Sequence, residues 1–280
     1  MRSMEQPQRG RAGVGTAAAL LLFAALVAPG GGCTSLTQMT QGVTYRRTPE
    51  ANYKKGLVEL KDENYPEATK YFAFVKNKFP FSRFATLAEL RLADTYYAQE
   101  KYLEAIDAYK LFIKFHPTHD EVTGGYVSYR ICEGYMKQIP SDWFLVPPSH
   151  EKDQGATKDA MRELQAFLTT FKQSKHLPQV KALYRRCIRR LADHELYVAR
   201  FYLDQDKPKA TILRLETLLK QYPDAGVDPE VMLLLGQTYM KLDKKEQART
   251  TFAGLIKKYP NDSHSAKAKL YLEFLAGQRD

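Results

Sequence analysis

A small-residue position recurs along this chain and constrains its fold more than any other feature. Its occupants are spaced by 37, 39, 67 and 37 residues: Gly56, Ala93, Cys132, Ala199 and Gly236. A tyrosine follows three residues later in four of the five cases. Periods of this length are typical of helical solenoids, in which two-helix units stack because none folds alone. Such folds present long surfaces and usually lack a catalytic centre, so the repeat favours recognition of a polypeptide.

Residues 83–115 show the repeating unit most clearly. Apolar residues at three- and four-residue steps predict two amphipathic helices, separated by a polar break at 99–101. His116-Pro117 ends the second helix because proline disfavours the helical conformation of the residue before it. The pattern resembles the tetratricopeptide repeat (TPR). We therefore predict an all-α, TPR-like helical solenoid of about five helix-turn-helix repeats plus a C-terminal closing helix at 264–276.

Two positions refine this prediction. Asp228-Pro229 is expected to supply the N-cap and the first-turn proline of the fifth hairpin. The 67-residue step interrupts the third repeat, and much of its excess is a predicted long loop at 139–155. This loop contains the only tryptophan, in Trp143-Phe144, and long loops in compact folds are often functional. Local packing of an apolar plug and a binding role are both open interpretations of it.

The first 32 residues are predicted to be an export signal, separate from the solenoid. Three arginines precede an apolar run at 17–28, which is too short to span a bilayer. Cys33 resembles the lipidated cysteine of bacterial lipoproteins, because Gly31 and Gly32 provide the small residues before it, although Gly30 departs from the usual leucine. Thr34, in place of aspartate, resembles lipoproteins of the outer membrane. Acyl chains on Cys33 would anchor the chain, and residues 33–49 are predicted to be a flexible tether.

Other interpretations of the N-terminus and of the cysteines stay open. A soluble periplasmic protein cut near residue 32 is the alternative to lipidation. In an oxidising compartment Cys132 and Cys187 could form a disulfide, although the repeat position explains Cys132 as a packed small residue. The chain has no metal-binding motif, nucleophile motif or phosphate loop, so we expect no enzyme, no metal and no cofactor apart from a covalent lipid on Cys33.

A dense basic stretch lies at 181–190, with Lys181, Arg185, Arg186, Arg189 and Arg190 on one long predicted helix. The predicted export from the cytoplasm argues strongly against nucleic-acid binding. A solvated helix face, an acidic partner surface and anionic lipid head groups are the remaining alternatives.

Aromatic and basic residues on the first helices of the N-terminal hairpins are candidates for ligand contact. In TPR arrays these helices line the concave face. Tyr97 and Tyr129 fall outside the aromatic position of the repeat itself, and Arg91 and Arg130 could bind a carboxylate. The candidate client-peptide groove therefore consists of Arg91, Tyr97, Tyr129, Arg130, Trp143 and Phe144.

An ordered set of motifs resembles the BamD family, the TPR lipoproteins of the bacterial outer-membrane β-barrel assembly machine. The motifs cover about residues 50–260 and include Phe79-Pro80-Phe81-Ser82, Ala93-Asp94-Thr95-Tyr96-Tyr97, Phe115-His116-Pro117-Thr118-His119, Tyr129-Arg130, Trp143-Phe144, Asp153-Gln154 and Tyr197-Val198-Ala199-Arg200-Phe201-Tyr202. The resemblance implies a non-catalytic scaffold, lipid-anchored at the periplasmic face of the outer membrane. It implies a BamA-like barrel subunit, unfolded outer-membrane proteins and other assembly lipoproteins as partners, and no nucleic acid.

The resemblance also divides the chain into two halves. Repeats 1–3 at 50–175 are associated with unfolded clients in the family, and repeats 4–5 with the closing helix at 176–280 dock the barrel subunit. Arg214 matches the family's docking arginine. The alternative function is another periplasmic TPR adaptor, for cell-envelope constriction or for pilus or secretin assembly. A hydrolase is disfavoured because the sequence offers no acid/base constellation.

Overall fold

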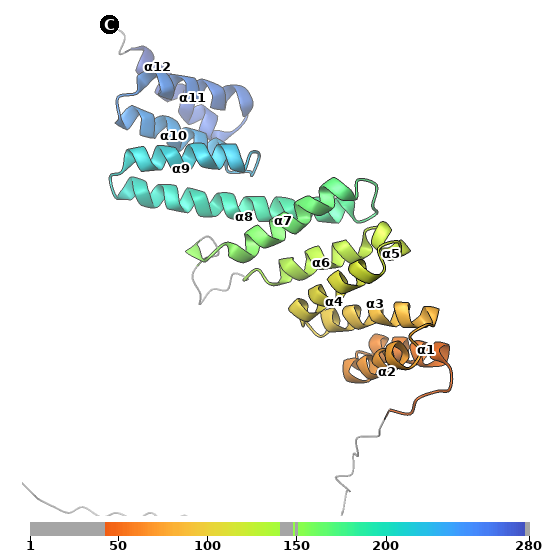
Figure 1. Cartoon of the computed structure of the whole chain (residues 1–280). Helices are drawn as coiled ribbons and strands as arrows, with labels where there is room; N and C mark the ends of the chain where they lie inside the picture. Colours follow the sequence, from red (N-terminus) through yellow and green to blue (C-terminus); the bar gives the residue numbers. More distant parts are fainter. Residues whose placement is uncertain (1–42, 141–147, 149–150, 278–280) are drawn as a thin grey trace, which may run out of the picture. The chain divides into compact units, whose positions relative to one another are not determined.

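The computed structural model describes residues 43–140, 148 and 151–277, which form α-helices and no strands (Figure 1). The helices are α1 (Pro49–Lys61), α2 (Tyr65–Lys78), α3 (Arg83–Ala98), α4 (Tyr102–Phe115), α5 (Asp120–Thr123), α6 (Tyr126–Lys137), α7 (Gly155–Thr170), α8 (Leu177–Asp204), α9 (Pro208–Gln221), α10 (Asp228–Lys241), α11 (Lys245–Lys258) and α12 (Ser263–Ala276). The predicted sites at Cys33, Trp143 and Phe144 lie outside the described residues.

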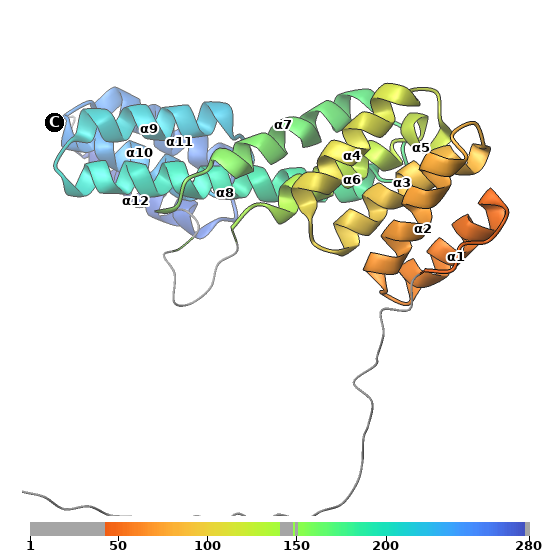
Figure 2. The ribbon, with the colours of Figure 1, turned by 60° about the horizontal axis from the view of Figure 1, so that its bottom comes forward.

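Consecutive helices pack as hairpins (Figure 2). α1 pairs with α2, α3 with α4, α6 with α7, α8 with α9 and α10 with α11, while α12 packs on α11. The second helix of each hairpin also contacts the first helix of the next, so that apolar faces are buried between neighbours. The predicted all-α, TPR-like solenoid of five repeats with a closing helix is therefore confirmed.

The recurring small residue is where the two helices of a hairpin come closest. A Cβ added at Gly56 would lie 2.7 Å from Cε1 of Phe72 on α2. One added at Gly236 would meet the ring of Phe252 on α11 even more closely. Ala93, Cys132 and Ala199 occupy the same position in their hairpins and are fully buried. The small residue recurs in the sequence because each helix pair leaves little space at this position.

Helix α8 accounts for much of the extra length in the 67-residue step. It is 28 residues long, whereas its partner α9 has 14. Its first half packs on α7 through Val180 and Cys187, and its second half packs on α9 through Leu196 and Ala199. The rest of the long step lies between the end of α6 at Lys137 and the start of α7.

The turns inside four hairpins share one backbone conformation. The second residue after the first helix has a positive φ, and it is Glu63, Glu100, Asp206 or Asp243. The next amide donates to a carbonyl five residues earlier, as Lys101 does to Tyr96 at 3.0 Å. This left-handed ending closes the helix without glycine.

At the fifth hairpin, the N-cap prediction was wrong in detail: Val227 is the cap, and the Asp228 carboxylate accepts from the Asp224 amide at 3.0 Å instead.

The first described residues pack on the first hairpin. Tyr45 stacks on Phe74 with ring centroids 3.9 Å apart, and the Tyr71 hydroxyl donates to the Thr44 carbonyl at 3.3 Å. Asn52 on α1 bonds both the amide and the carbonyl of Arg46. Part of the tether predicted at 33–49 is therefore packed on the first hairpin, and residues 33–42 lie outside the described residues.

Cys132 and Cys187 lie in one apolar cluster between α6, α7 and α8, and both are free thiols. The Cys187 Sγ is 3.3 Å from Sδ of Met136. Burial raises the pKa of the Cys132 thiol to about 12 and that of Cys187 to about 11. The packing role expected for Cys132 accounts for its position.

Among the described helices, none combines the length and the hydropathy needed to cross a bilayer.

Candidate functional site

A buried carboxylate joins three helices of the N-terminal half. Asp94 lies on α3 next to the small-residue position and forms an ion pair with Arg91 one turn before it. Its Oδ1 accepts from the Tyr109 hydroxyl of α4 at 2.5 Å and from the Tyr126 hydroxyl of α6 at 2.9 Å. Both carboxylate oxygens are therefore satisfied, as a buried charge requires.

Arg130 on α6 continues this network. Its Nε donates to the Tyr109 hydroxyl at 3.3 Å, and its Nη1 donates to Oε2 of Glu133 at 2.8 Å. The guanidinium also lies 3.6 Å from the centroid of the Tyr97 ring, the geometry of a cation–π contact. The network thus extends from α3 and α4 along the length of α6.

Tyr129 connects the network to the start of α8. Its hydroxyl donates to Oε1 of Glu133 at 2.7 Å, and its ring stacks on His176 with centroids 4.4 Å apart. His176 is the residue immediately before α8, and its Nε2 is buried without a hydrogen-bond partner among the described residues. Burial and the charge of Lys175 lower the pKa of His176, which favours a neutral ring in this stack.

The structure therefore brings together four of the six residues predicted for the groove: Arg91, Tyr97, Tyr129 and Arg130. The prediction that Arg91 and Arg130 contact a bound carboxylate stays a prediction; in the structure the two guanidiniums pair with Asp94 and Glu133 of the chain itself. Both arginine side chains keep about a fifth to a quarter of their surface exposed, at 25% and 20%. An incoming carboxylate would share donors that are already in use.

The tyrosines of this network are neutral hydrogen-bond donors. Burial, reinforced by the charge of Asp94, raises the pKa of Tyr126 to about 12. The same two causes raise the pKa of Tyr109 further. Ionising either hydroxyl would place a second negative charge against Asp94, so both stay protonated at any pH at which the protein functions.

Sequence reasoning missed Asp94, Tyr109, Tyr126, Glu133 and His176. One signal was available for Asp94, because it interrupts the apolar face of α3 between Leu90 and Tyr97 at helical spacing. A charge in a buried stripe requires partners, and tyrosines on the next helices are suitable donors. No sequence signal connected Tyr129 with His176, which is 47 residues away.

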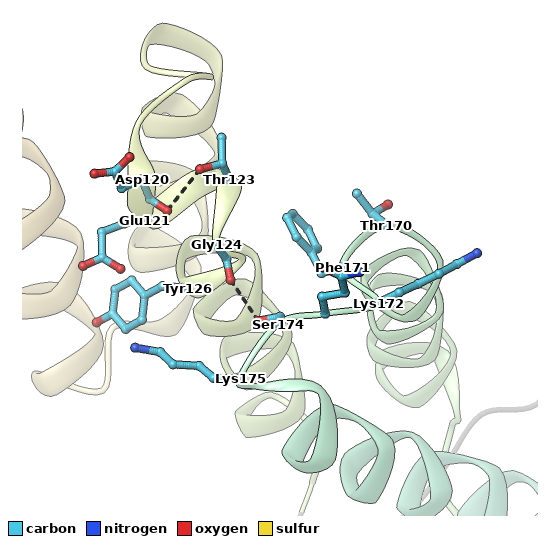
Figure 3. Close-up of a pocket in the computed structure, with 11 residues that line it drawn as sticks. Asp120, Glu121, Thr123, Gly124, Tyr126, Thr170, Phe171, Lys172, Ser174 and Lys175 are labelled. Atoms are coloured by element: carbon cyan, nitrogen blue, oxygen red, sulfur yellow. Dashed lines mark hydrogen bonds between the residues drawn. The ribbon is translucent and has the colours of Figure 1, made fainter.

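A cleft of about 680 Å³ lies beside the network, between α5 with the start of α6 and the turn from α7 to α8 (Figure 3). Asp120 and Glu121 lie on one side, and Lys172 and Lys175 on the other, with the Tyr126 ring at the border. Ser174 Oγ donates to the Gly124 carbonyl at 2.8 Å and joins the two walls. Opposite charges face each other here, so the cleft has no charge preference of its own.

Arg214 lies on α9, far along the chain from the predicted groove. Its Nη1 is 3.3 Å from Oε2 of Glu195 on α8, and its guanidinium is 5.9 Å from the centroid of the Tyr202 ring. Its side chain remains 41% exposed, so it can contact another molecule while it is paired. In the described part of the chain, no group of three or more His, Cys, Asp or Glu side chains is placed to hold a metal ion.

Comparison with known proteins identifies the family. A family model described as "Outer membrane lipoprotein", the YfiO family, matches residues 46–253. The chain belongs to this family. The YfiO match covers every hairpin from α1 to α9 and most of the last one, including Asp94, Arg130 and Arg214.

Curated relatives of this YfiO-family chain share a name. The outer membrane protein assembly factor BamD of Neisseria gonorrhoeae is 25% identical over 224 residues, which cover 78% of this chain and 82% of that protein. BamD of Caulobacter vibrioides is 26% identical over 254 residues, covering 91% and 78%. Among solved structures, the TPR2AB-domain:pHSP90 complex of yeast Sti1 is similar, with a TM-score of 0.44 and 15% identity, covering 82% of this chain and 86% of that one.

Proposed function

We propose that the chain is a non-catalytic scaffold of outer-membrane protein assembly, bound to the periplasmic face of the outer membrane. The observation that carries this proposal is the YfiO match across residues 46–253, together with relatives named outer membrane protein assembly factor BamD. The stacked hairpins suit such a role because they offer long surfaces for several partners at once.

Lipid on Cys33 would hold the first hairpin near the membrane. Thr44 lies eleven positions after Cys33, and its carbonyl accepts a hydrogen bond from Tyr71 of α2. A fully extended chain of this length reaches at most about 40 Å. Replacement of Cys33 by serine should therefore release the protein from the membrane fraction into the soluble periplasmic fraction. Continued membrane attachment of the Cys33→Ser protein would mean that lipid is not the anchor.

The C-terminal repeats are proposed to dock a BamA-like barrel subunit through Arg214. The Arg214→Glu substitution reverses the charge and places a second carboxylate beside Glu195, so it should remove most of the barrel subunit that co-purifies from membranes. Lys220→Glu is the matched control, since Lys220 is exposed on the same helix. Equal recovery of the barrel subunit with both variants would argue against docking at Arg214.

The N-terminal repeats are proposed to bind the aromatic C-terminal end of unfolded outer-membrane proteins. Tyr97 and Tyr129 are only partly buried, so their rings can contact a peptide beside Arg130 and His176. The exposed parts of Arg91 and Arg130 offer N–H donors to a terminal carboxylate. The test compares two labelled peptides that end in phenylalanine, one with a free carboxylate and one with an amide. The protein should prefer the carboxylate, and Arg91→Gln/Arg130→Gln should lose this preference while its circular dichroism stays helical. A folded variant with an unchanged preference would rule out the two arginines.

A further inference from the structure

A second cleft, of about 1160 Å³, shares no lining residue with the first cleft or with the network around Asp94. It is bounded by the end of α6, the first half of α8 and the turn at 223–226 between α9 and α10. Its lining carries five cations against two carboxylates: Lys137, Arg185, Arg186, Arg189 and Arg190, with Asp193 and Asp224. Asp224 is itself paired with Lys258, 2.9 Å away and outside the cleft. The cleft is therefore strongly positive.

The arginines of the cleft divide into two kinds. Arg189 has a structural role, because it donates to Asp193 at 2.9 Å and to the Gly226 carbonyl at 3.1 Å, joining α8 to the far wall. Arg185 and Arg186 are exposed, and neither is paired with a carboxylate in the described part of the chain. These two guanidiniums are available to a ligand.

The placement of these charges destabilises the isolated helix. Lys181 and Arg185, Arg185 and Arg189, and Arg186 and Arg190 are like-charged pairs four residues apart on α8. Such pairs face each other on a helix and repel. A solvated surface gains nothing from this arrangement, whereas a bound anionic partner would remove the repulsion.

Two residues that line the cleft each carry a buried hydrogen-bond donor without an acceptor. Gln138 Nε2 and Arg190 Nη2 are buried and have no partner among residues 43–140, 148 and 151–277. Arg190 uses its Nε for Gln154 at 3.2 Å, so only part of its guanidinium is satisfied. Buried unpaired donors are unfavourable, and a ligand that supplies carboxylate or carbonyl oxygens would satisfy both once the two side chains turn toward the cleft.

The floor of the cleft is apolar, which narrows the ligand class. It contains Met136, Ile139, Cys187 and Ile188. We propose that this cleft binds an acidic segment of another protein, one in which carboxylates alternate with apolar side chains. Carboxylates would pair with Arg185 and Arg186, whose planar forks suit bidentate bonding, while apolar side chains enter the floor. A walled, partly apolar cleft fits a polypeptide segment better than it fits the plane of a lipid surface.

The test measures binding of a short fluorescein-labelled peptide that alternates glutamate and leucine. The full chain should bind it in a salt-dependent manner, and Arg185→Glu/Arg186→Glu should weaken binding by about tenfold or more. Lys267→Glu/Lys269→Glu on α12 changes the net charge equally and should leave binding intact, since both lysines are exposed outside the cleft. Gln138→Leu should weaken binding without lowering the unfolding midpoint, because it removes an unpaired buried donor.

Three further results would overturn the proposal. The first is absence of peptide binding, or equal loss in the cleft variant and the α12 control. The second is binding of the lysine–leucine version of the peptide with the same affinity. The third is tighter binding of phosphatidylglycerol vesicles or of a single-stranded oligonucleotide than of the acidic peptide. If only the cleft variant loses this tighter binding, the cleft binds lipid or nucleic acid instead.

Discussion

At the scale of single residues, Asp94 connects the second hairpin to the third. It is 8% exposed, and its three partners come from α3, α4 and α6. A buried carboxylate of this kind stabilises a fold only while its partners are present, because an uncompensated charge is strongly unfavourable. Its value to the molecule is geometric, since it fixes Tyr109 and, through it, the position of Arg130 beside Tyr97.

Replacement of Asp94 by asparagine should lower the free energy of unfolding by about 1–3 kcal/mol. The amide oxygen can still accept from Tyr109 and Tyr126, but Arg91 loses its counter-charge. Urea-induced unfolding followed by circular dichroism measures the change. Asp107→Asn, at an exposed position of α4, is the control and should stay within about 0.5 kcal/mol of the original protein. Equal stability of the two variants would show that the network contributes nothing.

The stack of His176 on Tyr129 predicts a pH dependence. The pKa of His176 is lowered in the folded state, so the unfolded chain binds the proton more tightly. The stability that the neutral ring contributes is fully present above pH 6.5, the ordinary pKa of histidine. It is lost as the pH falls from 6.5 towards the lower pKa of His176 in the folded state. His176→Phe keeps a ring for the stack but cannot titrate. Its unfolding free energy should fall less than that of the original protein between about pH 7.5 and about pH 5.5; parallel profiles would contradict this.

The sequence predicted the members of this site better than their roles. Helical spacing placed Tyr97, Tyr129 and the two arginines on first helices, and the structure brings them together. Spacing along one helix does not show what lies across from it, so the pairing of Arg130 with Tyr109 and of Tyr129 with His176 could not be predicted. Both contacts depend on how separate helices pack. In the second contact, α7 and its flanking segments lie between Tyr129 and His176 in the sequence.

At the scale of elements, the small-residue position and helix α8 determine how hairpins form and join. Gly236 and Phe252 are in contact because glycine leaves room for the ring. This requirement repeats in every hairpin, which explains why the spacing alone predicted the helix pairs. The turn and cap details were harder to predict, since Asp228 can either cap its own helix or bond the Asp224 amide, and local sequence permits both.

A pair of glycine substitutions tests the close approach. Gly236→Ala should lower the unfolding free energy by about 1–3 kcal/mol, because the new methyl group overlaps the Phe252 ring. Gly254→Ala is the control on α11, where the nearest side-chain atom, Cε of Met232, is 3.4 Å away. It should raise stability by up to about 1 kcal/mol, since alanine favours helix over glycine. Both free energies come from the same denaturant titration, and a stabilising Gly236→Ala would contradict the steric account.

At the scale of the whole molecule, α8 links the two halves that the sequence predicted. Its first half shares an apolar cluster with α6 and α7, and its second half shares another with α9 to α12. The proposed client site is therefore connected through His176 to the same helix that pairs with Arg214 through Glu195. The basic cleft lies on this helix as well, between the two sites along the chain. A scaffold that holds several partners in register requires such a shared element.

Depletion of the protein in its own host tests the central claim most directly. Outer-membrane fractions are collected as the protein disappears, and the amounts of many β-barrel proteins are measured together by quantitative mass spectrometry. The proposed scaffold role predicts a broad loss of barrel proteins before growth stops. Unchanged barrel proteins accompanied by a defect in cell constriction or pilus assembly would contradict it and would assign the chain to another envelope adaptor.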